Sequence, residues 1–331
     1  MSFAAIFFSA LFAIKSADVQ EGQKVTALLL KADDGASGEL FGRLSPEMKK
    51  VFTDAAAITA FSRGLADQLG AEEKVVRERS FPVGGMTSYL RVSRFEKSKE
   101  PVLTLWTFDA QGTVLGLFVR PEGAGAAATT HGEYQTKTPL RFPLQGAWYT
   151  FWGGHNAIEN YHAVDRGQRF AYDLLILKDG KSHEGDGSKV EQFYAYGKPV
   201  LAPADGVVTA TEADRPDMTP GKMDPLHPMG NHVIIDHGDG EFSFLCHLRL
   251  GSLKVKAGEK VSAGQPIAEC GNSGNTSEPH LHYHLQDTGK FGDGDGLPAQ
   301  FRDVVIDGEK VAKGEPLRGQ TIQPQEDDAH E

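Results

Sequence analysis

The spacing of apolar residues changes along the chain, and its first part predicts helices. Residues 25–31 and 48–68 carry apolar side chains at intervals of three and four, which is the period of a helix with one buried face. Ser45, Pro46 and Glu47 come just before the second segment. Serine is a preferred N-cap and proline is favoured at the first helical position, so this tripeptide predicts the start of a helix.

After position 80 the chain alternates between apolar and polar residues, which predicts strands. The alternating stretches are residues 87–92, 102–108 and 114–119. Asp109 to Gly112 have the composition of a turn between the last two, so we expect a hairpin there. Two helices followed by a short antiparallel sheet predict a small α+β domain. This part of the sequence has no cluster of histidines, cysteines or paired acids, and we expect a binding or spacer module.

From about residue 140 the chain consists of short apolar stretches separated by turns that are rich in glycine. The expected strands are residues 200–209 with a turn at Asp205-Gly206, residues 232–236 and 241–248 around a turn at 237–240, residues 251–261 and 265–270, and residues 281–285 as the last strand. Short strands at this spacing predict a mainly-β domain of antiparallel sheets. Residues 212–229 interrupt the pattern with an insertion rich in Asp, Pro and Met, and we expect it to form a wall of a groove.

Some segments differ in composition from both domains. Phe3 to Ile14 is apolar but shorter than the ~20 residues that cross a bilayer, and it predicts a secretory signal peptide; a buried N-terminal helix is the alternative. Gly123 to Ala128 matches the dinucleotide pattern G-x-G-x-x-A, but it lies in a tract of small residues, so we interpret it as linker. The predicted boundaries are 1–17 for the signal peptide, 18–121 for the α+β domain, 122–139 for the linker, 140–318 for the β-rich domain and 319–331 for an acidic tail.

Composition excludes several classes of protein. The 331 residues carry 34 Lys and Arg against 45 Asp and Glu, a net charge of −11, whereas a nucleic-acid binder needs a basic surface. Two cysteines, Cys246 and Cys270, are too few for a disulfide scaffold, and the sequence leaves open whether they are bridged. The chain lacks the G-x-S-x-G motif of serine hydrolases and the G-x-x-x-x-G-K-S/T phosphate loop. We expect no integral membrane segment in the mature chain.

The strongest chemical signal is the sequence Pro279-His280-Leu-His282-Tyr-His284. Alternate residues of a strand point to one face, so the three histidines should share a face at spacings of roughly 6.5–7 Å. Imidazole is the commonest metal ligand in proteins, and a catalytic zinc ion takes three protein ligands. A polar stripe that faces solvent is the alternative interpretation. A metal site therefore needs further ligands from elsewhere in the chain.

Three residues upstream are candidates to complete such a site. Asp173 precedes the apolar stretch 174–177, where a carboxylate needs a partner such as a metal, and His162 lies eleven residues before it. His247 is embedded in the apolar stretch 244–248, where it could act as a proton acceptor or an oxyanion donor beside a metal. Each residue also has an ordinary structural interpretation, as a salt-bridged aspartate or a buried core histidine.

The order of motifs from Asp173 onward resembles one known family. The shared motifs are Asp173, Ala204-Asp-Gly-Val-Val208, Val233-Ile-Ile-Asp-His-Gly238, Leu245-Cys-His247-Leu, residues 255–265, Gly271-Asn-Ser-Gly274 and Pro279-His-Leu-His282. Over roughly Trp148 to Gln286 the chain is similar to the lysostaphin/LytM-type zinc metallopeptidases, whose fold is the mainly-β duplicated hybrid motif. Less specifically, residues 105–121 resemble the small α+β domain of the nuclear-transport-factor type that precedes such peptidases.

The resemblance implies a role for the candidate residues. Asp173 and His282 match metal ligands, whereas His247 and His280 match the two catalytic histidines. His284 departs from the family pattern, because an acid is commoner at that place.

The first metal ligand also departs from the common pattern. In most members a histidine lies four residues before the aspartate, but this position is Arg169 here. A subgroup with a longer segment is similar to residues 160–173, and this similarity makes His162 the expected third ligand. His155 is the alternative.

The implied function is a zinc-dependent endopeptidase that hydrolyses peptide bonds, with Zn²⁺ as cofactor and peptidoglycan crosslinks or stem peptides as substrate. Together with the signal peptide, the resemblance predicts an exported protein in the periplasm or outside the cell. The alternative is a catalytically inactive cell-wall-binding or regulatory protein on the same fold. The presence of both catalytic histidines and of all expected ligands favours the enzyme.

Overall fold

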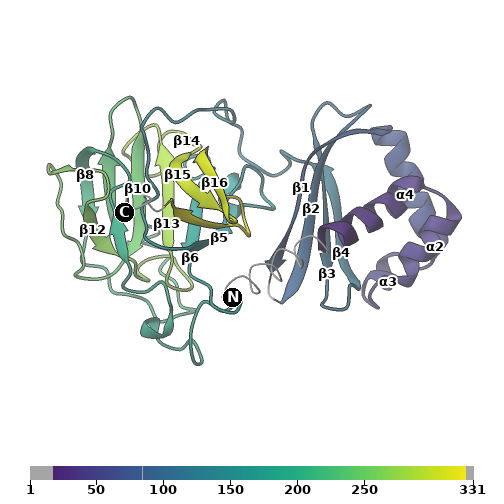
Figure 1. Cartoon of the computed structure of the whole chain (residues 1–331), viewed down its shortest axis with the longest axis horizontal. Helices are drawn as coiled ribbons and strands as arrows, with labels where there is room; N and C mark the ends of the chain where they lie inside the picture. Colours follow the sequence, from purple (N-terminus) through teal and green to yellow (C-terminus); the bar gives the residue numbers. More distant parts are fainter. Residues whose placement is uncertain (1–17, 84, 326–331) are drawn as a thin grey trace, which may run out of the picture. The chain divides into compact units, whose positions relative to one another are not determined.

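The computed structural model describes residues 18–83 and 85–325, which divide into two compact units that meet in sequence between Ala124 and Gly125 (Figure 1). The expected signal peptide lies outside the described residues. Within the described ranges, no helix has the length and apolar character needed to cross a membrane.

The first unit packs helices against one face of an antiparallel sheet. Its helices cover residues 18–31, α2 (Asp34–Gly42), α3 (Met48–Val51) and α4 (Ala55–Leu69). Its strands are β1 (Glu72–Val83), β2 (Met86–Phe95), β3 (Val102–Phe108) and β4 (Val114–Pro121), which lie in the order β1-β2-β3-β4. Leu29 and Ile58 of the helices and Tyr89 and Trp106 of the sheet are completely or almost completely buried in one core.

The prediction of one continuous helix over residues 48–68 is wrong. The chain leaves the helical conformation at Phe52, and a second helix begins at Asp54, whose carboxylate accepts the Ala57 amide at 2.8 Å. Helix α3 begins at Met48 after Glu47, two residues later than predicted, although the Ser45 hydroxyl still accepts the Met48 amide at 3.2 Å. The predicted hairpin between β3 and β4 is confirmed. Strand β1 was not predicted, because charged residues fill both of its faces.

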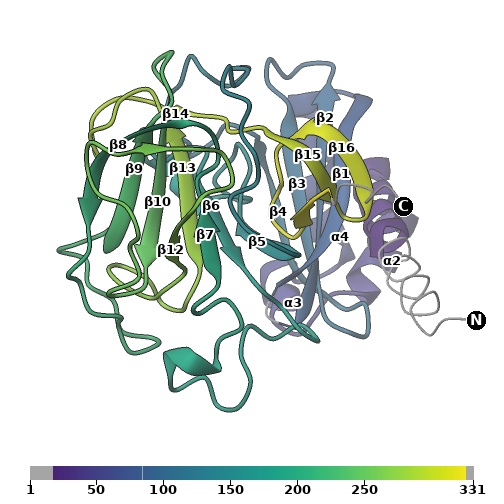
Figure 2. The same ribbon diagram turned by 60° about the vertical axis from the view of Figure 1, so that its left-hand side comes forward.

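The second unit consists of short antiparallel strands. They are β5 (Trp148–Trp152), β6 (Tyr172–Leu175), β7 (Pro199–Leu201), β8 (Gly206–Glu212), β9 (Asn231–Asp236), β10 (Phe242–Leu248), β11 (Lys260–Val261), β12 (Pro266–Glu269), β13 (Leu281–Gln286), β14 (Gly296–Leu297), β15 (Phe301–Ile306), β16 (Glu309–Gly314) and β17 (Thr321–Pro324). The main sheet has the order β11-β8-β9-β10-β13-β6-β5-β17-β15-β16, and β14 pairs with β13. Strands β10, β13 and β6 therefore lie side by side at its centre (Figure 2).

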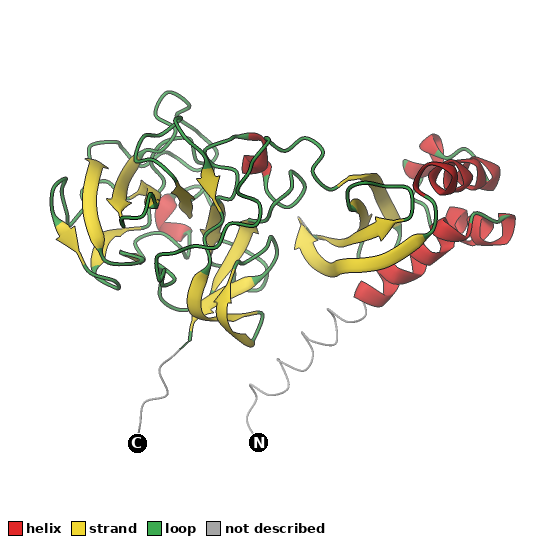
Figure 3. Ribbon diagram, turned by 90° about the horizontal axis from the view of Figure 1, so that it is seen from above, coloured by secondary structure: helices red, strands yellow, loops and turns green. Residues whose placement is uncertain are grey.

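Helices are concentrated in the first unit, whereas strands and loops build the second (Figure 3). This arrangement confirms the predicted fold class, an α+β domain followed by a mainly-β domain with antiparallel sheets. The core of the second unit includes Tyr172, Tyr283 and Phe301, which are at most 1% exposed. The three aromatic rings pack against one another.

Two predictions for the second unit are wrong in detail. The strand expected over residues 251–261 is confined to Lys260 and Val261, which form β11 and pair with β8. Residues 281–285 are not the last strand, and the predicted acidic tail begins too early. Residues 321–324 form β17, and Ile322 is completely buried between β5 and β15.

Candidate metal centre

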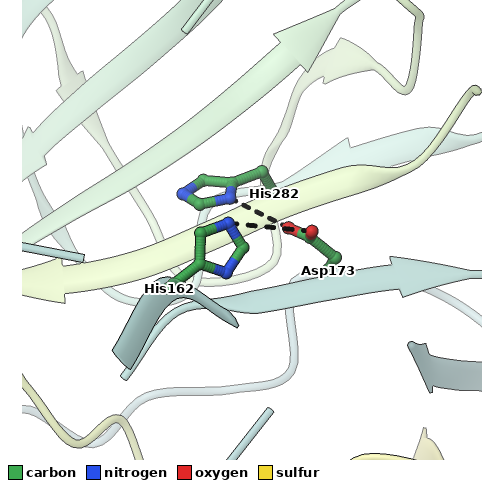
Figure 4. Close-up of side chains that lie close together, drawn as sticks. All are labelled: His162, Asp173 and His282. Carbon is green, nitrogen blue, oxygen red and sulfur yellow. Dashed lines mark hydrogen bonds and ion pairs between the residues drawn. The ribbon is translucent and has the colours of Figure 1, made fainter. Parts of the chain in front are cut away.

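Three side chains with metal-binding atoms meet in the second unit: His162, Asp173 and His282 (Figure 4). His282 Nδ1 lies 2.9 Å from Asp173 Oδ1, and His162 Nε2 lies 3.7 Å from Asp173 Oδ2. One donor atom from each of the three residues lies within 4.8 Å of the other two, and all three side chains are buried. The structure thus brings together the three residues that the sequence predicts as ligands.

Strand pairing brings two of these residues together. Asp173 on β6 stands directly opposite His282 on β13, although they are 109 residues apart in sequence. The third residue comes from a short 3-10 helix, Tyr161–Val164, whose N-cap is Asn160. The His162 ring also packs against the ring of Tyr161, with centroids 3.9 Å apart.

Asn160 fixes the orientation of the His162 ring. Its amide nitrogen donates to the carbonyls of Gly154 at 3.1 Å and Ala171 at 2.9 Å, so its Oδ1 points the other way. That oxygen accepts from the backbone amide of His162 at 3.1 Å and lies 3.0 Å from its Nδ1. The His162 Nδ1 must therefore carry the proton, and the lone pair of Nε2 faces Asp173.

The two predicted catalytic histidines adjoin this cluster. The His247 ring lies 4.8 Å from that of His280 and 5.7 Å from that of His282, measured between centroids. His247 Nδ1 donates to the Ser273 carbonyl at 2.9 Å, and His280 Nδ1 donates to the Glu278 carbonyl at 2.8 Å. With Nδ1 as the donor, the neutral form of each ring has its lone pair on Nε2.

His247 adopts an unusual backbone conformation. Its φ is +61°, a left-handed value that is costly for a residue with a Cβ atom. It lies where the pairing of β9 and β10 is interrupted between Leu245 and Leu248. Such a bulge interrupts the regular alternation of side chains along a strand. At this bulge the His247 ring lies beside the ring of His280.

His284 is also part of this cluster and is 1% exposed, so the polar-stripe interpretation is wrong for it. Its Nδ1 lies 3.0 Å from Nε2 of His282, and its ring stacks on Phe244. His155, the alternative ligand, lies elsewhere, because its Nε2 pairs with Glu315 at 2.7 Å.

The charges of the cluster shift the pKa values of its members. Burial alone would raise the pKa of Asp173, but His162, His280 and the hydrogen bonds from His280 and His282 hold it well below its usual range. Burial lowers the pKa of His162 to about 3 and that of His247 well below its usual value. Burial also acts to lower the pKa of His280, but the charge of Asp173 outweighs it and the net shift is upward. Asp173 is therefore held in its ionised form, whereas His162 and His247 are held in their neutral forms.

This donor set fits a divalent transition metal ion such as zinc. Two neutral imidazoles and a carboxylate form one of the common three-ligand sets of catalytic zinc. Zinc bonds of 2.0–2.2 Å in a tetrahedron place neighbouring donor atoms about 3.4 Å apart. His282 faces Asp173 Oδ1 at 2.9 Å and His162 faces Oδ2 at 3.7 Å, so the two histidines approach different oxygens of the carboxylate.

Two cavities border the cluster. One of about 240 Å³ is lined by His162, His247 and His282, and another of about 360 Å³ by Asp173 and His280. Tyr161 and Asn275 line both cavities. The predicted insertion contributes to each wall, with Pro228 and Met229 in the first cavity and Met223 in the second. The sequence did not predict Tyr161 as a lining residue; its position beside His162 is the signal that could have identified it.

The second unit thus has the features of a candidate metallohydrolase centre. It is a mainly-β domain with a buried His–Asp–His set and two further histidines beside it. Residues 186–293 match the family profile described as Peptidase family M23, so the second unit contains a domain of this family. The matched residues include His247, His280 and His282, whereas His162 and Asp173 precede them.

Curated relatives of this domain include a peptidoglycan endopeptidase and an activator of murein hydrolases. The chain is 40% identical over 90 residues to the peptidoglycan DD-endopeptidase ShyA of Vibrio cholerae, a match that covers 27% of this chain and 17% of the relative. It is 30% identical over 123 residues to the murein hydrolase activator NlpD of Salmonella dublin, covering 37% and 29%. The chain thus spans less than a third of the length of these relatives.

Among solved structures, the chain is similar to the antimicrobial peptidase lysostaphin from Staphylococcus simulans. The identity is 20%, the TM-score is 0.29, and the match covers 49% of this chain and 52% of that chain.

Proposed function

We propose that this protein is a zinc-dependent endopeptidase that hydrolyses peptide bonds of bacterial peptidoglycan. The observation that carries the proposal is the meeting of His162, Asp173 and His282 beside His247 and His280 in one buried cluster. In this proposal the first three residues hold the metal and the other two perform the proton chemistry. When bound, zinc supplies Lewis acidity, which polarises a peptide carbonyl and makes water acidic enough to react near neutral pH.

His280 is the better candidate for the general base. Its unprotonated Nε2 lies 3.5 Å from Asp173 Oδ1, and the negative charge of Asp173 raises its pKa against the opposing effect of burial. It can accept a proton from the attacking water and then donate it to the leaving amine. His247 stays neutral, because burial keeps its pKa low, and it orients the water through its Nε2.

The surroundings of the cluster suit a peptide substrate. The larger cavity is lined by Phe151, Trp152, Leu175 and Met223, which offer apolar surface to peptide side chains, and by the carboxylate of Glu278. Peptidoglycan is proposed as the source of the peptide because ShyA, a relative of this domain, is a peptidoglycan DD-endopeptidase. An enzyme with this substrate works outside the cytoplasm, in agreement with the expected signal peptide.

The proposal is tested by measuring zinc content and peptidase activity of the purified full chain and its variants. Asp173→Ala and His282→Ala should lose both zinc and activity, because they remove ligands. His280→Ala should keep zinc and lose activity by about 10²-fold or more, the usual effect of general acid–base catalysis. His155→Ala is the control and should change neither quantity. If His162→Ala keeps full zinc and activity, the proposed ligand set is wrong.

A second candidate is a regulatory role without catalysis, since the relative NlpD is a murein hydrolase activator. The complete set of five side chains favours hydrolysis over this role. A chain that binds zinc but cleaves no peptidoglycan, and that stimulates a separate murein hydrolase, would favour the regulatory role.

A further inference from the structure

The larger of the two cavities beside the metal centre combines an apolar wall with one further carboxylate. Its volume is about 360 Å³, and its lining residues include two acids, Asp173 and Glu278, but no lysine or arginine. In the proposed function Asp173 holds the metal, so Glu278 is the carboxylate that remains for a substrate. The cavity therefore offers one negative charge that the metal does not neutralise.

An irregularity of strand β5 builds the apolar wall of this cavity. Neighbouring residues of a strand normally point to opposite faces, yet Phe151 and Trp152 both line the cavity, with ring centroids 5.5 Å apart. The pairing of β5 with β6 shifts register between Thr150 and Trp152, so Phe151 is the extra residue of a bulge. Tyr161 also lines the cavity, and its ring centroid lies 5.2 Å from that of Trp152. The wall thus contains three aromatic rings.

Hydrogen bonds hold Glu278 in place at the same cavity. Its carbonyl oxygen accepts the Thr276 hydroxyl and His280 Nδ1, each at 2.8 Å. Its carboxylate accepts the Ser182 hydroxyl through Oε2 at 2.5 Å. A hydroxyl donor satisfies a lone pair but does not neutralise the charge, and the residue is only half-buried. Glu278 is therefore a fixed carboxylate that can still accept from a positively charged group.

The wall and the carboxylate together select the chemistry of an occupant. A purely apolar side chain would pack on the aromatic rings but would remove the Glu278 carboxylate from water without a charged partner, which is unfavourable. A second carboxylate would be repelled. A long aliphatic chain that ends in an ammonium group avoids both penalties, because its stem packs on the rings while its tip pairs with Glu278.

We propose that Glu278 is a specificity-determining residue and that this cavity binds a lysine-like side chain of the substrate, with an aliphatic stem and a terminal ammonium. The inference rests on the proposed function and deepens it, because it names the class of peptide that the site takes. The nearby guanidinium of Arg318 does not occupy this place, since it lies over the Trp152 ring and donates to the carbonyl of Ile158.

The test compares two synthetic stem peptides that differ in one side chain. One contains lysine and the other Nε-acetyl-lysine, which keeps the aliphatic stem and removes the charge. Binding to the full chain is followed by the fluorescence of Trp152, because the other two tryptophans, Trp106 and Trp148, are at most 1% exposed. The lysine peptide should bind about tenfold more tightly, near the lower end of what a hydrogen bond to a charged group contributes.

Two variants locate this preference in Glu278. Glu278→Gln keeps an acceptor for the Ser182 hydroxyl and removes the charge, so the two peptides should bind within about twofold of each other. Asp165→Asn is the matched control, because Asp165 lines the smaller cavity instead. Its Oδ1 accepts the amides of Gly167 and Gln168, and an asparagine can accept them as well. This control should keep the preference of the unmodified chain.

The outcomes distinguish this inference from the proposed function. If the unmodified chain binds both peptides equally or binds neither, or if Glu278→Gln keeps the preference, the role of Glu278 is wrong. Tighter binding of peptide-free glycan strands than of the lysine peptide would also overturn it, because the aromatic wall would then hold sugars. A chain that prefers the lysine peptide through Glu278 but releases no fragments from peptidoglycan supports the cation site and contradicts the proposed hydrolysis.

Discussion

Two buried asparagines in one loop allow a sharp test of how His162 is held. Asn156 and Asn160 are both completely buried, and each makes several hydrogen bonds within residues 154–171. Asn160 alone contacts His162, through the backbone amide and Nδ1. We therefore predict that Asn160→Ala weakens zinc binding, whereas Asn156→Ala, the matched control, does not.

The magnitude follows from the bonds that are lost. Removing an outer partner of a metal-binding histidine costs about 10- to 100-fold in metal affinity, which corresponds to about 1.4–2.7 kcal/mol. The carbonyls of Gly154 and Ala171 also lose their donor in Asn160→Ala, and each orphaned buried group costs about 1–3 kcal/mol of stability. Asn156→Ala orphans the amides of Ile158 and Glu159 and should cost a similar amount of stability.

The assay pairs chelator competition for zinc with chemical denaturation of the metal-free chains. Both variants should lose about 2–5 kcal/mol of unfolding free energy, and only Asn160→Ala should lose zinc affinity beyond about threefold. Asn160→Asp should keep most of the affinity, because its carboxylate still accepts from His162. Equal zinc affinity in Asn160→Ala and Asn156→Ala would refute the reasoning, either because His162 is no ligand or because Asn160 does not orient it.

Two further predictions concern the support of the site. The pKa of Glu241 would be raised by burial, but hydrogen bonds from residues 134–138 lower it below its usual value. Its contribution to stability is therefore complete above the unfolded pKa and is lost as pH falls through the folded pKa. Glu241→Gln should cost about 2–4 kcal/mol in denaturant unfolding at pH 7, and the cost should shrink as the pH falls below ~4, where the unfolded carboxyl becomes protonated. A pH-independent difference would contradict this. Gly230 has a φ of +55°, and a Cβ there would lie 2.1 Å from the Ser273 carbonyl oxygen, which accepts from His247. Gly230→Ala should lower the free energy of unfolding by at least about 3 kcal/mol and reduce the peptidase rate. Gly238 has a φ of +82° and open space around it, so Gly238→Ala should lower the free energy of unfolding by only about 1–2 kcal/mol and leave the rate unchanged. Equal effects of the two variants would show that the contact with Ser273 is unimportant.

The sequence predicts the features of the fold and of the site that depend on the spacing of nearby residues. The alternation at residues 280–284 predicted histidines that share a face, and the β9–β10 hairpin follows from its turn residues, Gly238 and Gly240. The residue types of Asp109 to Gly112 likewise predicted the turn between β3 and β4. In each case neighbours in the sequence form the contact, so the pattern contains the needed information.

The rest depends on contacts between distant residues, which no local pattern contains. The pairing of β17 with β5 joins residues more than 170 positions apart, and it places Ile322 of a polar, acidic segment in the core. The interruption of one long predicted helix at Phe52 has a local cause, the N-cap Asp54, which the apolar period concealed. The contact of Asn160 with His162 appears only when the hydrogen bonds of the folded chain are followed.

The central claim is that the buried cluster makes this chain a zinc-dependent peptidoglycan endopeptidase. The most direct measurement is mass analysis of the fragments released when the zinc-loaded full chain is incubated with purified peptidoglycan. We predict new peptide termini at one type of bond, each with the mass of one added water, and none with the Asp173→Ala variant. Intact peptidoglycan after incubation with a chain that carries one zinc ion per molecule would contradict the claim.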